Sequence, residues 1–118
     1  MTISVEIINQ LSDNYSYLIS NNESSSGIII DPAEPDPIMD VLNKKKLNLD
    51  YIFITHHHSD HTSGVAGLVK AYPEVKIFSP SELNSISVNL ISDGNKIITN
   101  LNEFKIIHTP GHLSLIHI

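Results

Sequence analysis

The sequence of 118 residues predicts a mixed domain of the α/β (α+β) class, because strand patterns and helix patterns alternate along it. Two apolar runs, residues 28–30 and 51–54, are continuous, as in strands that are buried on both faces. Two other segments, one starting at Asp36-Pro37 and one at residues 64–71, carry apolar side chains at helical spacing. The hydrophobic fraction of 41% suits a globular domain rather than a disordered chain.

The first elements read as a hairpin followed by a buried strand. Residues 3–8 alternate apolar and polar side chains before they become continuous, which indicates a strand with one better-covered face. Asp13-Asn14 supplies a turn, and residues 15–19 form the return strand. The β-branched run at residues 27–31 is the next strand, and Pro32 ends it.

A helix and two further elements come next. Asp36 is the expected N-cap and Pro37 the first helical residue, and the helix reaches the lysines at positions 44–46. Residues 51–55 form a buried strand that leads directly into a histidine run. Residues 64–71 carry a short helical pattern.

The last third of the chain is predicted to be rich in strands. Residues 75–78 form one strand, and more follow between residues 86 and 108, separated by turns at Asp93-Gly94-Asn95 and Asn100-Leu101-Asn102. Both faces of the central strands are apolar, whereas the two helices can cover one face only. We therefore expect a second face that no layer of this chain covers.

Composition excludes several classes of partner. The formal net charge of −6 disfavours nucleic acid, and the lysine run at 44–46 is interpreted as a solvated helix end. No apolar stretch approaches the roughly 18 to 20 residues that a membrane span needs, and the N-terminus shows no secretory signal. The chain has no cysteine for disulfides or thiolate ligands. We expect a cytoplasmic monomer.

The densest functional signal is the run Thr55-His56-His57-His58-Ser59-Asp60-His61. Residues two apart in an extended loop point the same way, so His56 and His58 can converge on one metal ion. Asp60 and His61 lie further on and can serve a second ion. His112 follows a strand and a Pro-Gly turn, a typical way to bring a third ligand to the first ion. Imidazole and carboxylate suit zinc, with iron or manganese as alternatives.

Three other residues near this cluster are open to simpler interpretations. His57 and His108 are interpreted as surface or hydrogen-bonded histidines. Asp31, at the end of its strand, is either a group that hydrogen-bonds a metal-binding histidine and orients it, or a turn residue that ends the strand.

The histidine run matches the T-H-x-H-x-D-H signature, and the chain resembles the metallo-β-lactamase superfamily. Within it, the chain is similar to hydroxyacylglutathione hydrolase, the glyoxalase II family. Asp13-Asn14-Tyr15, Ile30-Asp31-Pro32 and Thr109-Pro110-Gly111-His112 support this narrower match. The resemblance runs from about residue 3 to residue 112 and implies the N-terminal part of a metallo-β-lactamase-type αβ/βα sandwich.

The resemblance also implies a site and a reaction. His56, His58 and His112 would bind the first metal, and Asp60, as the catalytic carboxylate, and His61 the second. Two zinc ions would act in the intact enzyme. The implied reaction is hydrolysis of S-lactoylglutathione, or another S-(2-hydroxyacyl)glutathione, by a metal-bridging hydroxide, which yields the hydroxy acid and glutathione.

One departure from the family's usual sequence leaves other reactions as alternatives. Ser63 stands where the family usually has the first of two glycines, and Gly64 keeps the second. A related subfamily of mono-iron persulfide dioxygenases also lacks a glycine there. The alternatives are therefore a persulfide dioxygenase or another hydrolase of this fold, such as a lactonase.

The last six residues depart from the family pattern. Residues 113–118, Leu-Ser-Leu-Ile-His-Ile, match the in-frame translation of the mosaic-end adapter of transposase-made sequencing libraries. We therefore expect residues 1–112 to be the N-terminal part of a longer protein, called the parent protein below, and His117 not to be encoded. A natural stop codon directly after Ile118 in amplified source DNA would contradict this expectation.

The chain by itself would then lack part of its site. We expect the C-terminal helical domain that holds the substrate to belong to the rest of the parent protein. The fragment alone is expected to expose a large apolar face, to be insoluble or loosely folded, and to be inactive. A sharp, cooperative thermal transition of the monomeric 118-residue chain would contradict this.

Overall fold

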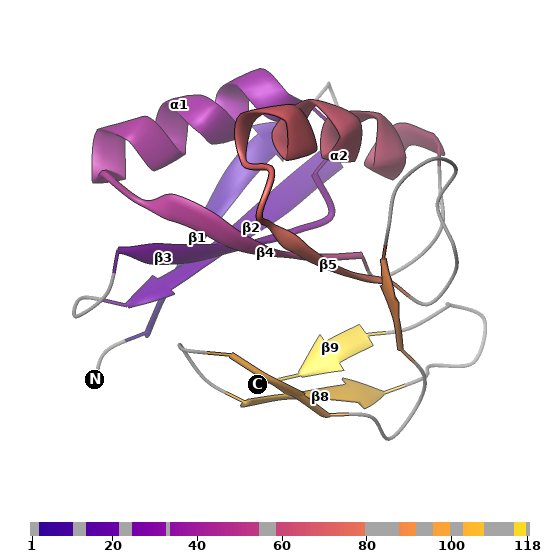
Figure 1. Cartoon of the computed structure of the whole chain (residues 1–118). Coiled ribbons are helices and arrows are strands. Elements are labelled where there is room, and N and C mark those ends of the chain that lie inside the picture. The colour runs from indigo at the N-terminus through magenta and orange to yellow at the C-terminus, as the bar shows by residue number, and fades with distance from the viewer. Residues whose placement is uncertain are drawn as a thin grey trace.

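The computed structural model describes residues 3–10, 14–21, 25–32, 34–54, 59–79, 88–91, 96–99, 103–107 and 115–117. Two helices cover one face of a six-stranded sheet, and a three-stranded sheet lies on the other side (Figure 1). The predicted α/β class is therefore confirmed. Neither helix in the described ranges is long and apolar enough to cross a lipid bilayer.

The larger sheet has the same strand order as the chain. Its strands are β1 (Ile3–Gln10), β2 (Asn14–Asn21), β3 (Ser26–Ile30), β4 (Asn48–Phe53), β5 (Lys76–Ser79) and β6 (Asn89–Leu90). The pairs β1–β2 and β2–β3 are antiparallel, whereas β3, β4, β5 and β6 run parallel. The predicted hairpin and the two buried central strands are confirmed.

The two helices connect the parallel strands and share one core with the sheet. Helix α1 (Pro35–Lys45) joins β3 to β4, and helix α2 (Ser59–Ala71) joins β4 to β5. The side chains of Ile38 and Leu42 on α1 and of Val65 and Leu68 on α2 are fully buried. They pack with one set of alternating sheet residues, including Leu18, Ile29, Leu49, Ile52 and Ile77.

A β-bulge in β4 decides which side chains face the helices. Gly27 of β3 pairs with Leu49, but the next residue, Ile28, pairs with Tyr51, so Asp50 is the extra residue. Its carboxylate accepts hydrogen bonds from the Ser26 hydroxyl and from the side-chain amide of Asn48. The bulge shifts the alternation by one residue, so Leu49 and Ile52 both face the helices.

The other face of the larger sheet carries a second core. Strand β7 (Lys96–Ile98) belongs to the smaller sheet together with β8 (Glu103–Ile107) and β9 (Leu115–His117). Its residue Ile97 is buried against the larger sheet, and the aromatic rings of Tyr51, Phe53 and Phe78 lie within 6.5 Å of one another there. The buried members of this cluster are Ile19, Ile28, Phe53, Ile91 and Ile97.

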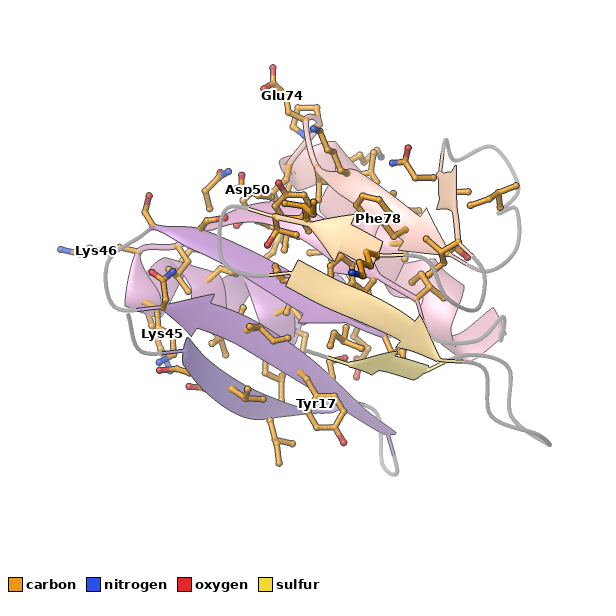
Figure 2. All side chains as sticks on the ribbon, turned by 90° about the horizontal axis from the view of Figure 1, so that it is seen from below. Tyr17, Lys45, Lys46, Asp50, Glu74 and Phe78 are labelled. Atoms are coloured by element: carbon orange, nitrogen blue, oxygen red, sulfur yellow. The ribbon has the colours of Figure 1, made fainter. Side chains whose placement is uncertain are left out.

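The expectation of an uncovered second face is therefore wrong for the part beneath the central strands. The sequence did not show that a strand from its last third folds back over Phe53. The expectation holds under the hairpin, where Val5 and Ile7 of β1 are 56% and 61% exposed and Tyr17 of β2 is 38% exposed. Seen from below, Tyr17 lies on the hairpin side of the molecule and Phe78 on the other side (Figure 2).

Helix α1 begins earlier than expected. Glu34, in an extended conformation, is its N-cap, and no side-chain hydrogen bond caps it. Asp36 is not the N-cap but a residue of the first turn. The reason is that Pro35, with its fixed φ and missing N–H, suits the first helical position as well as Pro37 does.

The end of α1 confirms the interpretation of the lysine run as a solvated helix end. Lys44 and Lys45 occupy the last turn of the helix. Lys46, which follows it, is exposed and projects from the molecule in Figure 2. Lys45 forms an ion pair with Glu6 of β1 at 3.1 Å, between side chains that are 43% and 42% exposed. Such exposed pairs contribute little to stability.

Lys46 is expected to be a site where glycine stabilises the parent protein. Its φ of 56° is left-handed, and the backbone N–H groups of Lys46 and Leu47 close the helix on Asn43 and Leu42. Glycine adopts this conformation without the steric cost of a Cβ, so Lys46→Gly should raise the free energy of unfolding by about 0.5–1 kcal/mol. Urea unfolding measures the change. Lys44→Gly, in the last helical turn, is the control and should instead lower it by about 1 kcal/mol.

The interpretation of residues 113–118 stays a prediction. Strand β9 pairs antiparallel with β8, and Leu115 lies opposite Ile107. This pairing does not show whether the gene encodes residues 115–117, because an adapter-derived segment could pair in the same way. Amplification of the gene from source DNA therefore remains the test.

Candidate metal site

The parallel strands of the larger sheet end at one edge, which is where ligands bind in open α/β sheets. Hydrogen bonds continue past the strand ends there. The N–H of Asp31, after β3, donates to the carbonyl of Phe53 at 2.9 Å, and the N–H of Ile54, after β4, donates to the carbonyl of Phe78 at 2.8 Å. The residues that follow Asp31 and Ile54 therefore start from neighbouring, fixed positions.

The histidine run leaves the sheet at this edge. Residues 55–58, with His56, His57 and His58, lie outside the described residues. The chain enters this segment from Ile54, which is fully buried, and leaves it at Ser59, the first residue of α2. The metal-binding roles of His56 and His58 stay predictions, but the sheet holds the entrance to their segment firmly.

Helix α2 begins five residues before the predicted position, at Ser59 instead of residue 64. The backbones of Asp60 and His61 therefore belong to the first helical turn and not to a loop. The signal that could have revealed this is the pair Ser59-Asp60, since both residue types are favoured at helix N-termini. Asp60 and His61 are thus carried by one rigid element, although their side chains lie outside the described part.

Asp31 is held in an uncommon backbone conformation. It is buried, with 8% of its surface exposed, and its φ of 54° is left-handed. Its N–H is bound to Phe53, and its carbonyl accepts a hydrogen bond of 2.7 Å from the hydroxyl of Ser16, which is completely buried. A left-handed residue at a strand end makes a turn, and Asp31 also lies next to the strand that leads to His56. Both predicted roles of Asp31 remain open.

Removing the Ser16 hydroxyl should destabilise this corner. Ser16→Ala leaves the buried carbonyl of Asp31 without this hydrogen bond, which is expected to cost about 1–3 kcal/mol of unfolding free energy. Thermal or urea unfolding of the parent protein measures the loss. Ser4→Ala, at an exposed position of β1, is the control and should change stability by less than about 0.5 kcal/mol. Equal stability of both variants would show that the hydrogen bond from Ser16 to Asp31 does not stabilise the protein.

The third predicted ligand of the first metal, His112, lies outside the described residues, as does His108. Both lie in the connection between β8 and β9, which pair antiparallel. The structure therefore tests neither the ligand role of His112 nor the interpretation of His108.

The donor set fits a metal site by its chemistry. Among the described side chains no three histidine, aspartate or glutamate residues gather around one point. The predicted ligands at 56–61 and at 112 are not among these side chains, and the site they would form stays a prediction. Neutral imidazole and carboxylate are ligands of zinc and, in mixed sites, of iron or manganese.

Five of the seven lysines lie at the opposite edge of the sheet. Helix α1 starts at the carboxyl edge after Asp31 and ends at the amino end of β4, which places Lys44, Lys45 and Lys46 there. Lys70 lies in the last turn of α2, and Lys76 starts β5. These five cations therefore lie away from the carboxyl edge of the sheet, where β4 ends.

A cleft of about 480 Å³ also lies at the amino ends of β4 and β5, away from the predicted site. Its lining includes the carboxylates of Asp50 and Glu74 and the side chains of Tyr51 and Tyr72. Figure 2 shows Asp50 and Glu74 at this end of the molecule. This cleft contains none of the predicted metal ligands.

The structure defines an α/β protein with two helices on one face of its larger sheet, and the histidine-rich run of the sequence follows the carboxyl end of β4. The chain belongs to the metallo-beta-lactamase superfamily, whose family model matches residues 11–90. The family predicted from the histidine signature is therefore confirmed.

Within this superfamily, the chain is similar to curated proteins that share one name. The chain is 40% identical over 105 residues to hydroxyacylglutathione hydrolase from Pectobacterium carotovorum, a match that covers 88% of this chain and 41% of the relative. It is also 40% identical over 108 residues to hydroxyacylglutathione hydrolase from Buchnera aphidicola, covering 91% of this chain and 43% of the relative. The chain thus spans about two fifths of the length of the curated relatives it matches.

Solved structures share the fold. The chain is similar to a metallo-beta-lactamase from Staphylococcus aureus with a TM-score of 0.79 at 19% identity, covering 98% of this chain and 38% of that one. It is similar to ETHE1 from Myxococcus xanthus with a TM-score of 0.75 at 21% identity, covering 98% and 54%. These likenesses confirm the metallo-β-lactamase-type architecture.

Proposed function

We propose that the parent protein is a hydroxyacylglutathione hydrolase, which cleaves S-lactoylglutathione or a related S-(2-hydroxyacyl)glutathione into a hydroxy acid and glutathione. One observation carries this proposal: identities of 36–40% to curated hydroxyacylglutathione hydrolases extend over 85–93% of this chain. The match includes the histidine run after β4. The expected monomeric state and cytoplasmic location stay predictions.

The proposed ligands divide into two sets. His56, His58 and His112 hold one metal, and Asp60 and His61 hold the other. Zinc is the proposed metal, with iron or manganese as alternatives. When bound, the two ions would activate a water molecule and polarise the thioester carbonyl.

The described residues support the proposed site because they fix the backbone on either side of the histidine run. The Asp31–Phe53 hydrogen bond ties the ends of β3 and β4 together, and α2 carries Asp60 and His61 in its first turn. A water molecule and a thioester must meet within a few tenths of an ångström of their productive geometry, so rigid supports for the ligands favour the reaction.

The carboxylates of the glutathione moiety need a cationic partner. Five of the seven lysines, at positions 44, 45, 46, 70 and 76, lie at the opposite edge of the sheet. We propose that residues outside this chain contribute to glutathione binding, in the part of the parent protein that corresponds to the remaining three fifths of the relatives.

The test uses the parent protein, recovered by extending the gene past His112 and purified with its metals. Hydrolysis of S-lactoylglutathione that stops on metal chelation and returns on zinc addition is the expected result. A parallel assay follows oxygen consumption with glutathione persulfide. Oxygen consumption at one iron per chain, without thioester hydrolysis, would overturn the proposal in favour of a persulfide dioxygenase. Hydrolysis of a lactone but not of the thioester would overturn it in favour of a lactonase.

A further inference from the structure

The connection between β3 and α1 is held at its start. The N–H of Asp31 donates to the carbonyl of Phe53, and the carbonyl of Asp31 accepts from the hydroxyl of Ser16. Pro35, the first residue of α1, follows Asp31 by four positions, and its ring fixes its φ. The start of α1 is therefore close in the chain to the carboxyl edge of the sheet.

Pro35 lies against Gly67 of α2. A Cβ atom added to Gly67 would lie 2.7 Å from Cγ and 3.0 Å from Cβ of Pro35. Atoms that close must move apart, and a proline ring cannot swing away as a long side chain can, because it is closed on the backbone. Glycine within a helix is unfavourable by itself, so its presence here is explained by this contact.

We propose that Pro35 and Gly67 form a contact that positions α2, and with it Asp60 and His61, against the carboxyl edge of the sheet. Gly67 lies six residues after His61 on the same helix, about 9 Å along its axis. A helix over this distance moves as one body, so a displacement at Gly67 reaches the first turn. Gly67 and Pro35 are positioning residues and do not touch the metals. This inference rests on the proposed two-metal site.

The test is Gly67→Ala in the zinc-loaded parent protein. Metal content is measured while a chelating buffer lowers free zinc, so that the two equivalents are titrated separately. The second equivalent should bind about 10- to 100-fold more weakly, as for other residues that support metal ligands, while the first keeps its affinity. The melting temperature should fall, although Gly→Ala inside a helix normally raises it.

Two further variants separate positioning from general destabilisation. Ala66→Gly changes the neighbouring, exposed residue of α2 and weakens the helix without touching Pro35. It should lower the melting temperature and leave the affinity for the second zinc unchanged. Pro35→Gly combined with Gly67→Ala removes both ring atoms, at 2.7 Å and 3.0 Å, and should restore most of the lost affinity.

The possible outcomes distinguish a failure of the positioning role from a failure of the proposed two-metal site. If the unaltered parent protein binds two zinc ions and Gly67→Ala binds both equally well, the positioning role is overturned. If the Pro35→Gly, Gly67→Ala double variant fails to restore the affinity, the contact is overturned as the cause. If the unaltered protein binds fewer than two metals, the two-metal site fails, and the positioning role fails with it.

Discussion

Replacing Asp60 with alanine in the parent protein should lower kcat for S-lactoylglutathione by about 10³-fold or more, equivalent to about 4 kcal/mol of transition-state stabilisation. Asp60 belongs to the first turn of α2 and is the proposed carboxylate ligand of the second metal. Without it, His61 is the only ligand that this helix offers. Steady-state kinetics and metal content, measured on the same preparation, check the expectation, and the second equivalent of zinc should be lost.

Two control variants make this result specific. Asp40→Ala removes an exposed carboxylate of α1 and should change neither kcat nor metal content. Asp60→Asn keeps the side-chain shape but removes the charge, so it should resemble Asp60→Ala in metal content. Unchanged turnover in Asp60→Ala would remove the two-metal mechanism.

Truncating Phe53 to alanine is the change with the largest expected effect on stability, a loss of about 3–5 kcal/mol of unfolding free energy. The side chain is completely buried, and its ring meets that of Phe78 edge to face at 5.7 Å. Removing it opens a cavity between the two sheets. Because domains are typically stable by only about 5–15 kcal/mol, the loss is a large part of the total.

Urea unfolding of the parent protein, followed by circular dichroism, measures this loss. Ile98→Ala is the matched control, since Ile98 lies beside Ile97 on β7 but is 78% exposed. It should change the free energy of unfolding by less than about 0.5 kcal/mol. A Phe53→Ala variant as stable as the control would show that the smaller sheet does not pack on Phe53.

Local patterns were enough to predict strands at the positions of β1 to β5 and the presence of two helices, but not the order of the strands in the larger sheet. The continuous apolar runs of β3 and β4 require cover on both faces, and the spacing of Ile38 and Leu42 requires a helix. The start of α2 was missed for a physical reason: none of the residues Ser59, Asp60, His61, Thr62 and Ser63 is apolar. Helical periodicity is carried by apolar residues, so it cannot show a polar first turn.

Contacts between distant segments were beyond prediction. The packing of Ile97 on Phe53 joins residues more than forty positions apart, and no local period encodes it. The bulge at Asp50 could not be predicted either, because a bulge is recognised by a shift in the pairing of two strands. Of the site, the sequence supplied only the candidate ligands and their order along the chain. The structure adds that Asp60 and His61 share a helix, while the roles of His56, His58 and His112 stay predictions.

The strand order of the larger sheet has a consequence for folding. Each strand from β2 to β6 pairs with the strand that precedes it in the chain, so no strand waits for a distant partner. Short closures cost little chain entropy, and a sheet of this kind can grow in the direction of synthesis. Strand β7 arrives only after β6 is complete. Until then Phe53 and its aromatic neighbours face water, which makes the nascent chain most prone to aggregation just before the smaller sheet closes over them.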